Sequence, residues 1–479
     1  MTSTTSTKST SPLVLVVLLS ATFVQLLNAS IVYVAVANIQ SSLHATSSQV
    51  QFVLVGYQLG FACMLITGAR LGDIFGRKRL FLIGMVTFTV ISILCSFAPT
   101  IEVLILARIL QGVTSGLMFP QVLSFIQVLY TGKDRAAALG SYGAAIGLGS
   151  ILGPTIGGAL IEANLGADPW RAIFFVNVPI GAAATIAAAR LLKESTTPDR
   201  PRLDIIGALL SAAGLGLVLF ALGTIADSSN YALTIAEFIA GLALLAVFVV
   251  YQRARTRANR FPVLDTGLFR YRNFSIGMLM SLVFYAGVPA FFLIFSLYLL
   301  EGQSFGPLLA GLATIPYAVG TIFASINADA VAARIGKAVL ALGAVVLVAG
   351  MLILLLTALL VGSGSIGFWV IPGLLLGGLG FGLFIPPLTD FVLDRLPAEK
   401  AGQASGTLTS IQQVGGAIGV TLISIVFFGT LASQGENQAG YTAALVAGLV
   451  FEAVVFVIAA LLVLALPNAR PQVLEENAA

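Results

Sequence analysis

Long stretches of apolar residues with almost no charge recur along the whole chain and restrict what it can fold into. A hydrocarbon core about 30 Å thick is crossed by roughly 20 apolar residues at 1.5 Å per residue. With 58% hydrophobic and 9% charged residues, the chain cannot cover a globule with polar groups as a water-soluble domain does. The sequence therefore predicts an all-α integral membrane protein with fourteen transmembrane helices. The predicted spans are 12–37, 48–71, 79–98, 101–127, 136–162, 169–191, 203–226, 232–252, 273–299, 306–328, 338–361, 367–391, 402–431 and 442–466.

A spacing of glycines and a proline in the fourth span recurs in the twelfth. Gly112, Gly116 and Pro120 in ARILQGVTSGLMFP are spaced like Gly378, Gly382 and Pro386 in IPGLLLGGLGFGLFIP. The repeat predicts two six-helix halves separated by an inserted pair, a plan that places a substrate site between the halves. The expected regions are a disordered N-terminus (1–11), an N-terminal bundle (12–191), a two-helix insertion (203–252), a cytoplasmic linker (253–272), a C-terminal bundle (273–466) and a cytoplasmic tail (467–479).

The positive charges predict the orientation. Basic residues stay on the cytoplasmic side when loops are short, and with the N-terminus inside, all but Arg108 and Arg171 of the 24 lysines and arginines lie there. Both termini are therefore expected in the cytoplasm. The pI of about 9.1 follows from this topology and gives no reason to invoke nucleic acid.

No set of residues suited to catalysis or metal binding is evident. The single His44 lies in a short polar loop, and Cys63 and Cys95 lie in apolar runs, so neither a metal site nor a catalytic triad is predicted. No GxxxxGKS or GxxxxGKT loop is present, so ATP is not expected to drive the protein. We expect no enzyme activity and no cofactor.

Five motifs resemble those of the major facilitator superfamily, and in particular of its fourteen-spanner drug:proton antiporter family. The motifs occur in the family's order, and the resemblance covers nearly the whole chain. They are GARLGDIFGRKR (68–79), ILARILQGVTSG (105–116), GPTIGG (153–158), WRAIFFVNVPIG (170–181) and PVLDTGLFRYRNF (262–274).

The first motif is expected to form a cytoplasmic gate. Asp73 ends the second span and Gly76 permits a tight turn into a basic cluster, Arg77, Lys78 and Arg79. A carboxylate is stabilised at the N-terminus of a helix, and the resemblance implies that this helix is the thirteenth span, near Gly402. The alternative is that the cluster only sets topology. Ala69 and Ile74 depart from the usual motif, which argues for a weaker latch.

Glycines of the fifth span recur every four residues and so share one helix face. This face, with the helix-bending Pro154, is expected to pack closely against the other half, and the resemblance links it to export. Ordinary packing of small residues explains the same pattern. The residues are Gly149, Gly153, Pro154, Gly157 and Gly158.

Arg108 lies inside the fourth span and lacks the acidic partner that the resemblance implies. A buried arginine is costly, so it should face a polar cavity or a partner, and we expect it to project into a water-filled central cavity. The position of the acidic partner, in LLNASIVYVAV of the first span, holds Asn28, and the thirteenth span carries no acid. This favours neutral or anionic cargo over cationic drugs.

The remaining polar residues inside spans are candidates for contact with substrate or protons, although such residues often only tie helices together. Glu452 and Glu237 are candidate proton sites; Asp390 and Asp394 are weaker ones. The candidate cavity residues are Asn28, Arg108, Gln111, Gln25, Tyr33, Gln58, Gln412 and Gln413.

These features predict a monomeric secondary exporter of small hydrophobic molecules in the plasma membrane, in contact with lipid and coupled to protons. A facilitator or exchanger of neutral or anionic amphiphiles without proton coupling stays open because Asn28 cannot titrate. A transporter-like membrane sensor is a third possibility, disfavoured by the short cytoplasmic loops.

Overall fold

The computed structural model describes residues 12–163, 168–195, 203–224, 230–258, 260, 262–362, 364, 366–393, 396 and 400–466. In these residues the chain forms helices joined by short turns, and no strand occurs. Fourteen helical segments are long and apolar enough to cross a membrane, which confirms the predicted number. The longer helices are α1 (Pro12–Ile31), α3 (Ser47–Phe75), α4 (Arg77–Ser96), α5 (Ile101–Leu129), α6 (Gly132–Glu162), α8 (Asn177–Leu191), α9 (Ile205–Thr224), α10 (Tyr231–Arg257), α11 (Arg272–Leu297), α13 (Ile315–Ile335), α14 (Ala338–Val361), α15 (Ile371–Leu393), α16 (Ala401–Gln434) and α17 (Gln438–Leu462).

Short helical segments extend several of these spans. The first span continues through η1 into a short helix, and the sixth and tenth are each built from more than one piece. The short elements are η1 (Val32–Ala35), α2 (Val36–Ser42), η2 (Pro169–Arg171), α7 (Ala172–Phe175), η4 (Thr266–Arg270), η5 (Tyr298–Gly302), α12 (Pro307–Ala313), η6 (Gly367–Val370) and η8 (Val463–Ala465).

Glycine allows two pairs of helices to pack with their backbones in contact. A Cβ added at Gly112 of α5 would lie 2.1 Å from the Tyr57 carbonyl oxygen of α3. A Cβ added at Gly378 of α15 would lie 2.0 Å from the Tyr317 carbonyl oxygen of α13. Neither distance is compatible with a side chain, so both glycines are required where the helices cross.

The two crossings are copies of each other. Residues of α15 follow their counterparts in α5 by 266 positions (Pro120 to Pro386), and residues of α13 follow those of α3 by 260 (Tyr57 to Tyr317). The same shifts relate Gly112 to Gly378 and the partners that they touch. The contacts therefore have the internal repeat that the glycine spacing predicts.

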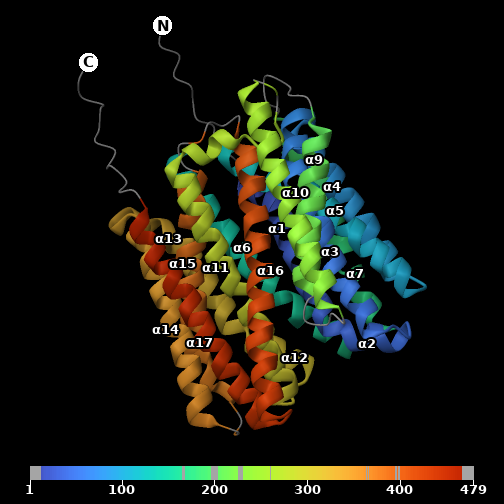
Figure 1. The fold of residues 1–479 in the computed structure, drawn as a ribbon, viewed down its shortest axis with the longest axis vertical. Helices are drawn as coiled ribbons and strands as arrows, with labels where there is room; N and C mark the ends of the chain where they lie inside the picture. The colour runs from blue at the N-terminus through green and yellow to red at the C-terminus, as the bar shows by residue number, and fades with distance from the viewer. Residues whose placement is uncertain are drawn as a thin grey trace.

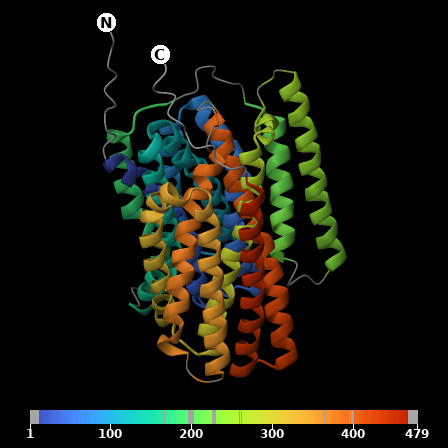
Figure 2. The same ribbon diagram turned by 90° about the vertical axis from the view of Figure 1, so that its left-hand side faces the viewer.

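The inserted pair α9 and α10 stands at one side of the molecule (Figure 2). The Cys63 thiol of α3 donates to the Ala212 carbonyl of α9 (3.1 Å), and the Thr421 hydroxyl of α16 donates to the Leu222 carbonyl (2.8 Å). α9 therefore touches both halves. α10 packs mainly on α9 and exposes much of its apolar surface, as suits a helix facing lipid.

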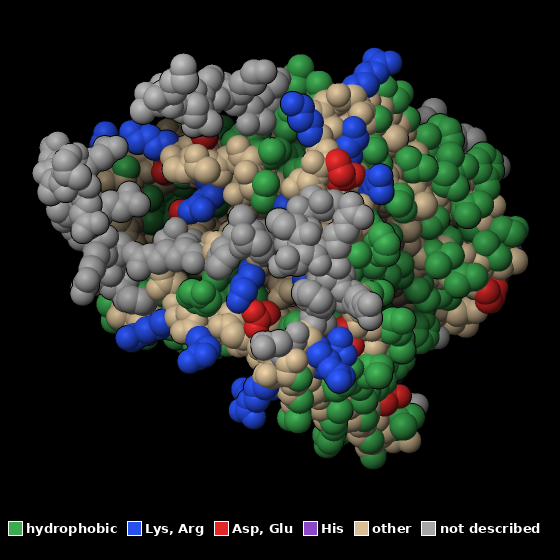
Figure 3. Space-filling view, turned by 90° about the horizontal axis from the view of Figure 1, so that it is seen from above, with side chains coloured by type: hydrophobic (Ala, Val, Ile, Leu, Met, Phe, Trp, Pro, Cys, Tyr) green, Lys and Arg blue, Asp and Glu red, His purple; other side chains and the backbone are tan. Residues whose placement is uncertain are grey.

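The two ends of the bundle differ in charge. Lysines and arginines gather on the end at the top of Figure 1, which Figure 3 shows face on. We call this end the basic face; the α3–α4 turn at Gly76 and the start of α16 lie there. The other end, which carries the α2–α3 turn at His44, is called the opposite face.

Alanine at either repeat-related glycine is expected to destabilise the protein. Gly112→Ala and Gly378→Ala force a Cβ against a carbonyl oxygen, and overpacking of this kind costs about 1–3 kcal/mol. Gly429→Ala is the matched control, because no atom lies within 4 Å of a Cβ there. Thermal unfolding in detergent should show a lower midpoint for the first two variants than for the wild type. The midpoint of the control should equal that of the wild type. Equal midpoints in all three would contradict the packing described here.

Candidate functional site

Arg108 is enclosed in a polar network within the N-terminal half. Its side chain is 1% exposed; Nε donates to the Val53 carbonyl (3.1 Å) and Nη1 to Gln111 Oε1 (2.7 Å). The guanidinium carbon lies 4.3 Å from the centre of the Tyr57 ring, which provides a cation–π contact. No carboxylate is found among the described residues that contact Arg108. Neutral dipoles therefore stabilise its positive charge.

Asn28 continues this network toward α8. Its Nδ2 donates to Gln111 Oε1 (3.1 Å), the same oxygen that accepts from Arg108. Asn177 Nδ2 donates to Asn28 Oδ1 (3.0 Å), and Gln111 Nε2 donates to Ser92 Oγ (2.8 Å). Side chains from α1, α4, α5 and α8 are thus joined in one chain of hydrogen bonds through the amides of Gln111 and Asn28.

The expectation that Arg108 projects into a water-filled cavity is therefore not met in this structure. The carbonyl and amide oxygens that a buried guanidinium needs are supplied by Val53 and Gln111 from within the same half. The sequence analysis named Arg108 and Gln111 as cavity candidates, but it did not predict that Gln111 and Val53 close around the charge. Tyr57 and Asn177 belong to the site and were not predicted as part of it.

The other predicted cavity residues differ in exposure. Tyr33 is 49% exposed, and Gln58 is exposed as well and donates from Nε2 to the Tyr33 hydroxyl (3.4 Å). Gln25 is buried, and its Oε1 has no hydrogen-bond partner among the described residues. In α16, Gln412 is buried and Gln413 is half-buried. Tyr33 and Gln58 are thus the members open to a molecule entering from outside.

Glu452 carries a fully buried carboxyl group. It lies on α17 with 0% exposure, and neither carboxylate oxygen has a hydrogen-bond partner among the described residues. It faces α11, because a Cβ at Gly287 would lie 2.7 Å from Glu452 Oε2. The side chain therefore points into the C-terminal half and not to lipid. Glu237 is half-buried on the peripheral α10, and Asp394 lies outside the described residues.

Asp73 lies against the start of α16, where the resemblance places it. A Cβ at Gly402 would lie 2.5 Å from Asp73 Oδ2, and Arg77 Nη2 donates to Oδ1 (3.0 Å). Gly76 has φ of +104°, which glycine adopts without strain, so the chain can turn directly into α4.

The other two residues of the basic cluster, Lys78 and Arg79, contact the segment that follows α8 and the end of that helix. The backbone amides of Lys78 and Arg79 donate to the Glu194 carboxylate (3.1 and 3.2 Å). Lys78 Nζ donates to the Ala189 carbonyl (2.7 Å), whereas the Arg79 side chain is 74% exposed. Among these basic residues, Arg77 is the one that touches the gate carboxylate.

Repeat-related residues join the two halves at the basic face. Gln127 Nε2 donates to the Leu393 carbonyl (3.0 Å), and these residues differ by the 266 positions that relate α5 to α15. A residue that contacts its own counterpart lies next to the axis that relates the two halves. This contact is therefore close to the centre of the basic face.

Two further contacts lie on either side of this axis. Ser124 of α5 and Ser405 of α16 are hydrogen-bonded (3.2 Å), and Arg135 Nε of α6 donates to Asp390 Oδ1 of α15 (2.8 Å). Asp390 is the counterpart of Ser124, again by 266 positions. These repeat-related positions therefore make different contacts: Ser124 makes a neutral hydrogen bond, and Asp390 makes an ion pair.

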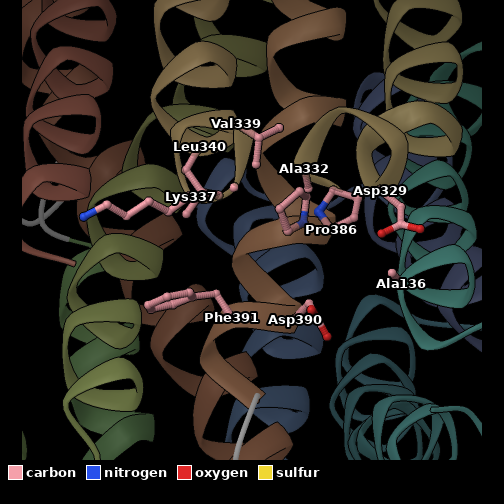
Figure 4. A pocket seen from close by; sticks show the side chains of 11 residues that line it. Ala136, Asp329, Ala332, Lys337, Val339, Leu340, Pro386, Asp390 and Phe391 are labelled. Carbon is pink, nitrogen blue, oxygen red and sulfur yellow. The ribbon is translucent and has the colours of Figure 1, made fainter. Parts of the chain in front are cut away.

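A cavity of about 230 Å³ opens beside the ion pair (Figure 4). It lies between α6, α13, α14 and α15, with Asp329 and Asp390 on one side and Lys337 on another. It is a small space at the basic face, and none of the residues that line it belongs to the Arg108 network.

The glycines of the antiporter motif pack within their own half, and the prediction that they contact the other half is wrong. A Cβ at Gly153 would lie 2.9 Å from the Leu27 carbonyl oxygen of α1, and Gly149 and Gly157 also face α1. Gly158 is buried and Pro154 half-buried. The spacing identified a close-packed face but not its partner, because both faces of α6 carry glycine.

A second glycine stripe on α6 faces the C-terminal half. A Cβ at Gly140 would lie 2.5 Å from the Ser325 carbonyl oxygen of α13, and one at Gly147 would lie 2.6 Å from Thr321 Cγ2. Gly143 belongs to the same stripe. The spacing of three and four residues in LGSYGAAIG could have identified this face.

On the opposite face, Asp168 ties together segments of the N-terminal half. Ser42 and Arg171 both donate to its carboxylate, and Arg171 Nη1 also donates to the Ala98 carbonyl (2.8 Å). The hydrogen bond from Ser42, followed by that from Arg171, lowers the pKa of Asp168 below its ordinary value. These contacts hold α2, η2 and the end of α4 as one unit.

The fold and the contacts define a polytopic helical membrane protein of two repeated halves. The model of the Major Facilitator Superfamily matches residues 18–420. The chain is 38% identical to the probable actinorhodin transporter of Streptomyces coelicolor over 87% of this chain and 72% of that protein. It is 30% identical to the puromycin resistance protein pur8 of Streptomyces alboniger, over 97% and 92%. The solved proton:xylose symporter XylE shares the fold, with a TM-score of 0.63 at 15% identity over 94% of each chain.

The chain therefore belongs to the Major Facilitator Superfamily, and its relatives are drug-efflux members of that superfamily. It is a transporter and not an enzyme. The family expected from the sequence motifs is confirmed.

Loss of the Asp73 charge is expected to open the basic face. Asp73→Asn removes the carboxylate that lies against α16 and binds Arg77. A cysteine introduced by Ser405→Cys, in a Cys63→Ala and Cys95→Ala background, is buried at this contact and reports the opening by its rate of maleimide labelling. We expect a rate increase of about fivefold, since a charge at a helix terminus contributes about 1 kcal/mol. Glu102→Gln, an exposed change on the opposite face, is the control; equal rates in all variants would disprove the latch.

Proposed function

We propose that the protein exports small hydrophobic molecules by alternating access. The observation that carries this proposal is the asymmetry of the bundle: polar contacts join the halves at the basic face, through Gln127, Ser405 and Asp390, whereas Tyr33 and Gln58 are exposed nearer the opposite face. This arrangement fits a transporter closed to one side and open to the other. Rocking of one half against the other would open the basic face and close the opposite face.

The substrate class is proposed from the candidate cavity residues that are not fully buried and from the relatives. Tyr33, Gln58 and Gln413 supply aromatic surface and a few hydrogen-bonding groups, which suits an amphiphile. The relatives are named for an antibiotic and for antibiotic resistance. Because the partners of Arg108 among the described residues are neutral, neutral or anionic amphiphiles are the preferred cargo.

We propose Glu452 as the proton site. A charged carboxylate buried without hydrogen-bond donors is far more costly than a neutral one, so a proton should bind when the group is enclosed and leave when water reaches it. Glu452 faces Gly287 of α11, and α11 in turn packs tightly on α16, where a Cβ at Gly419 would lie within van der Waals overlap of the Ala286 carbonyl. α16 bears the gate contact at Gly402, so a change at Glu452 has a path to the gate through two helices.

A facilitator or exchanger without proton coupling is the second candidate. It is favoured by Asn28, which accepts from Asn177 and donates to Gln111 with no titratable group between them. The network around Arg108 then contributes neutral hydrogen bonds and a fixed positive charge. The behaviour of Glu452 decides between the two functions.

The location follows from the charge distribution. We propose that the basic face is cytoplasmic, that the protein lies in the plasma membrane, and that it works as a monomer. The basic residues around the Gly76 and Gly336 turns fit the rule that positive loops remain inside.

The test is proton flux in reconstituted vesicles. With an imposed pH gradient, an exported amphiphile should dissipate the gradient in the wild type, as read by an internal pH dye. Glu452→Gln should abolish this dissipation because the amide cannot exchange a proton, while substrate exchange at equal pH persists. Glu237→Gln, a matched change on the peripheral α10, should leave the flux unchanged.

Other results have distinct meanings. Gradient dissipation that persists in Glu452→Gln would exclude Glu452 as the proton site. Substrate movement without any dissipation in the wild type would show the uncoupled facilitator. No movement of any amphiphile in either direction would reject transport of this class.

A further inference from the structure

A basic pocket lies on the basic face between the linker and the start of α16. It has a volume of about 370 Å³ and is lined by Gly267, Arg270, Tyr271 and Lys400. The first three belong to η4 and the residue that follows it; Lys400 immediately precedes α16. Two positive side chains and a tyrosine ring thus converge from segments that are distant in the sequence.

The charges of this pocket are not neutralised equally. Lys400 Nζ pairs with Asp265 Oδ2 at 2.6 Å. Arg270 is exposed, and the described residues offer its side chain no hydrogen-bond or ion-pair partner. One guanidinium is therefore available for an anion, and an ammonium group lines the same pocket.

The pocket lies at the depth of lipid headgroups. The ninth membrane span begins at Arg272 and the thirteenth at Gly402, directly after the lining residues. Phe269 and Tyr271, 43% and 39% exposed, flank Arg270. Aromatic side chains beside basic ones are typical of the membrane interface, where the ring is partly in lipid and the charge meets the headgroup.

We propose that this pocket binds the phosphate of an anionic phospholipid headgroup from the leaflet at the basic face. Arg270 would bind two phosphate oxygens, Lys400 would add a second charge, and the Tyr271 hydroxyl would donate a hydrogen bond. The exposed Phe269 favours a lipid over a free phosphate ion, because acyl chains cover its ring.

The pocket shares its wall with the gate. Gln403 Oε1 accepts from the backbone amide of Asp265 (2.9 Å), and Gly402 packs against Asp73. Residues 400–403 thus contact the pocket on one side and the gate carboxylate on the other. A bound headgroup would hold the start of α16 in place.

The experiment measures lipid binding to the full-length protein in detergent by native mass spectrometry. Short-chain phosphatidylglycerol is titrated into the wild type, Arg270→Gln, Lys400→Gln and Arg334→Gln. Arg334 is the matched control, an exposed arginine elsewhere on the basic face. Each contact between a basic residue and an anionic headgroup corresponds to about fivefold in affinity, so the first two variants should bind about fivefold more weakly and the control should match the wild type.

Two further arms identify the source of the phosphate. Phosphatidylcholine with the same chains should not bind at the concentrations at which phosphatidylglycerol does, and inorganic phosphate should displace phosphatidylglycerol only at a large excess. Displacement at comparable concentrations would show a free-phosphate site and overturn the lipid assignment. Unchanged binding in Arg270→Gln, or equal losses in Arg334→Gln, would overturn the site. Thermal unfolding of the lipid-free variants checks that each exposed change leaves the fold intact.

Discussion

Direct contact between helix backbones, at Gly112 and at its counterpart Gly378, is the constraint on which the rest of the structure depends. In a bilayer there is little hydrophobic driving force between helices, so close approach and the dispersion contacts it permits must hold them together. Each contact locks two helices of one half into a fixed relation. The proposed alternating access requires two such halves to move against each other with little change inside either.

Polar groups are distributed unequally between these halves. The N-terminal half encloses the charge of Arg108 among Gln111, Asn28 and a carbonyl oxygen, so this charge is satisfied without a proton. The C-terminal half encloses Glu452, which has no hydrogen-bond partner among the described residues. The first arrangement is stable in one protonation state, whereas the second gains from a proton each time it is enclosed. The proposed coupling to protons therefore belongs to the C-terminal half.

The sequence predicted the features that depend on spacing along one helix. The number of spans, the repeat at Gly112 and Gly378, and the turn at Gly76 all follow from residue types at fixed separations. The features it could not predict depend on which helix lies opposite. The glycines at 149, 153 and 157 were expected to touch the other half, yet they pack on α1, while Gly140 and Gly147 make the contact between halves. In the same way, no spacing in the sequence indicates that Val53 and Gln111 close around Arg108.

The most direct test of alternating access by two rigid halves is a set of spin-label distances in vesicles with and without a pH gradient and substrate. Labels replace exposed residues of opposite halves, Arg79 with Arg334 on the basic face and Glu102 with Glu301 on the opposite face, in a background without Cys63 and Cys95. The account predicts two populations in which one distance lengthens as the other shortens, while the distance from Arg79 to Glu102 within one half stays constant. A single distance under all conditions, or a change within the half as large as that between halves, would contradict it.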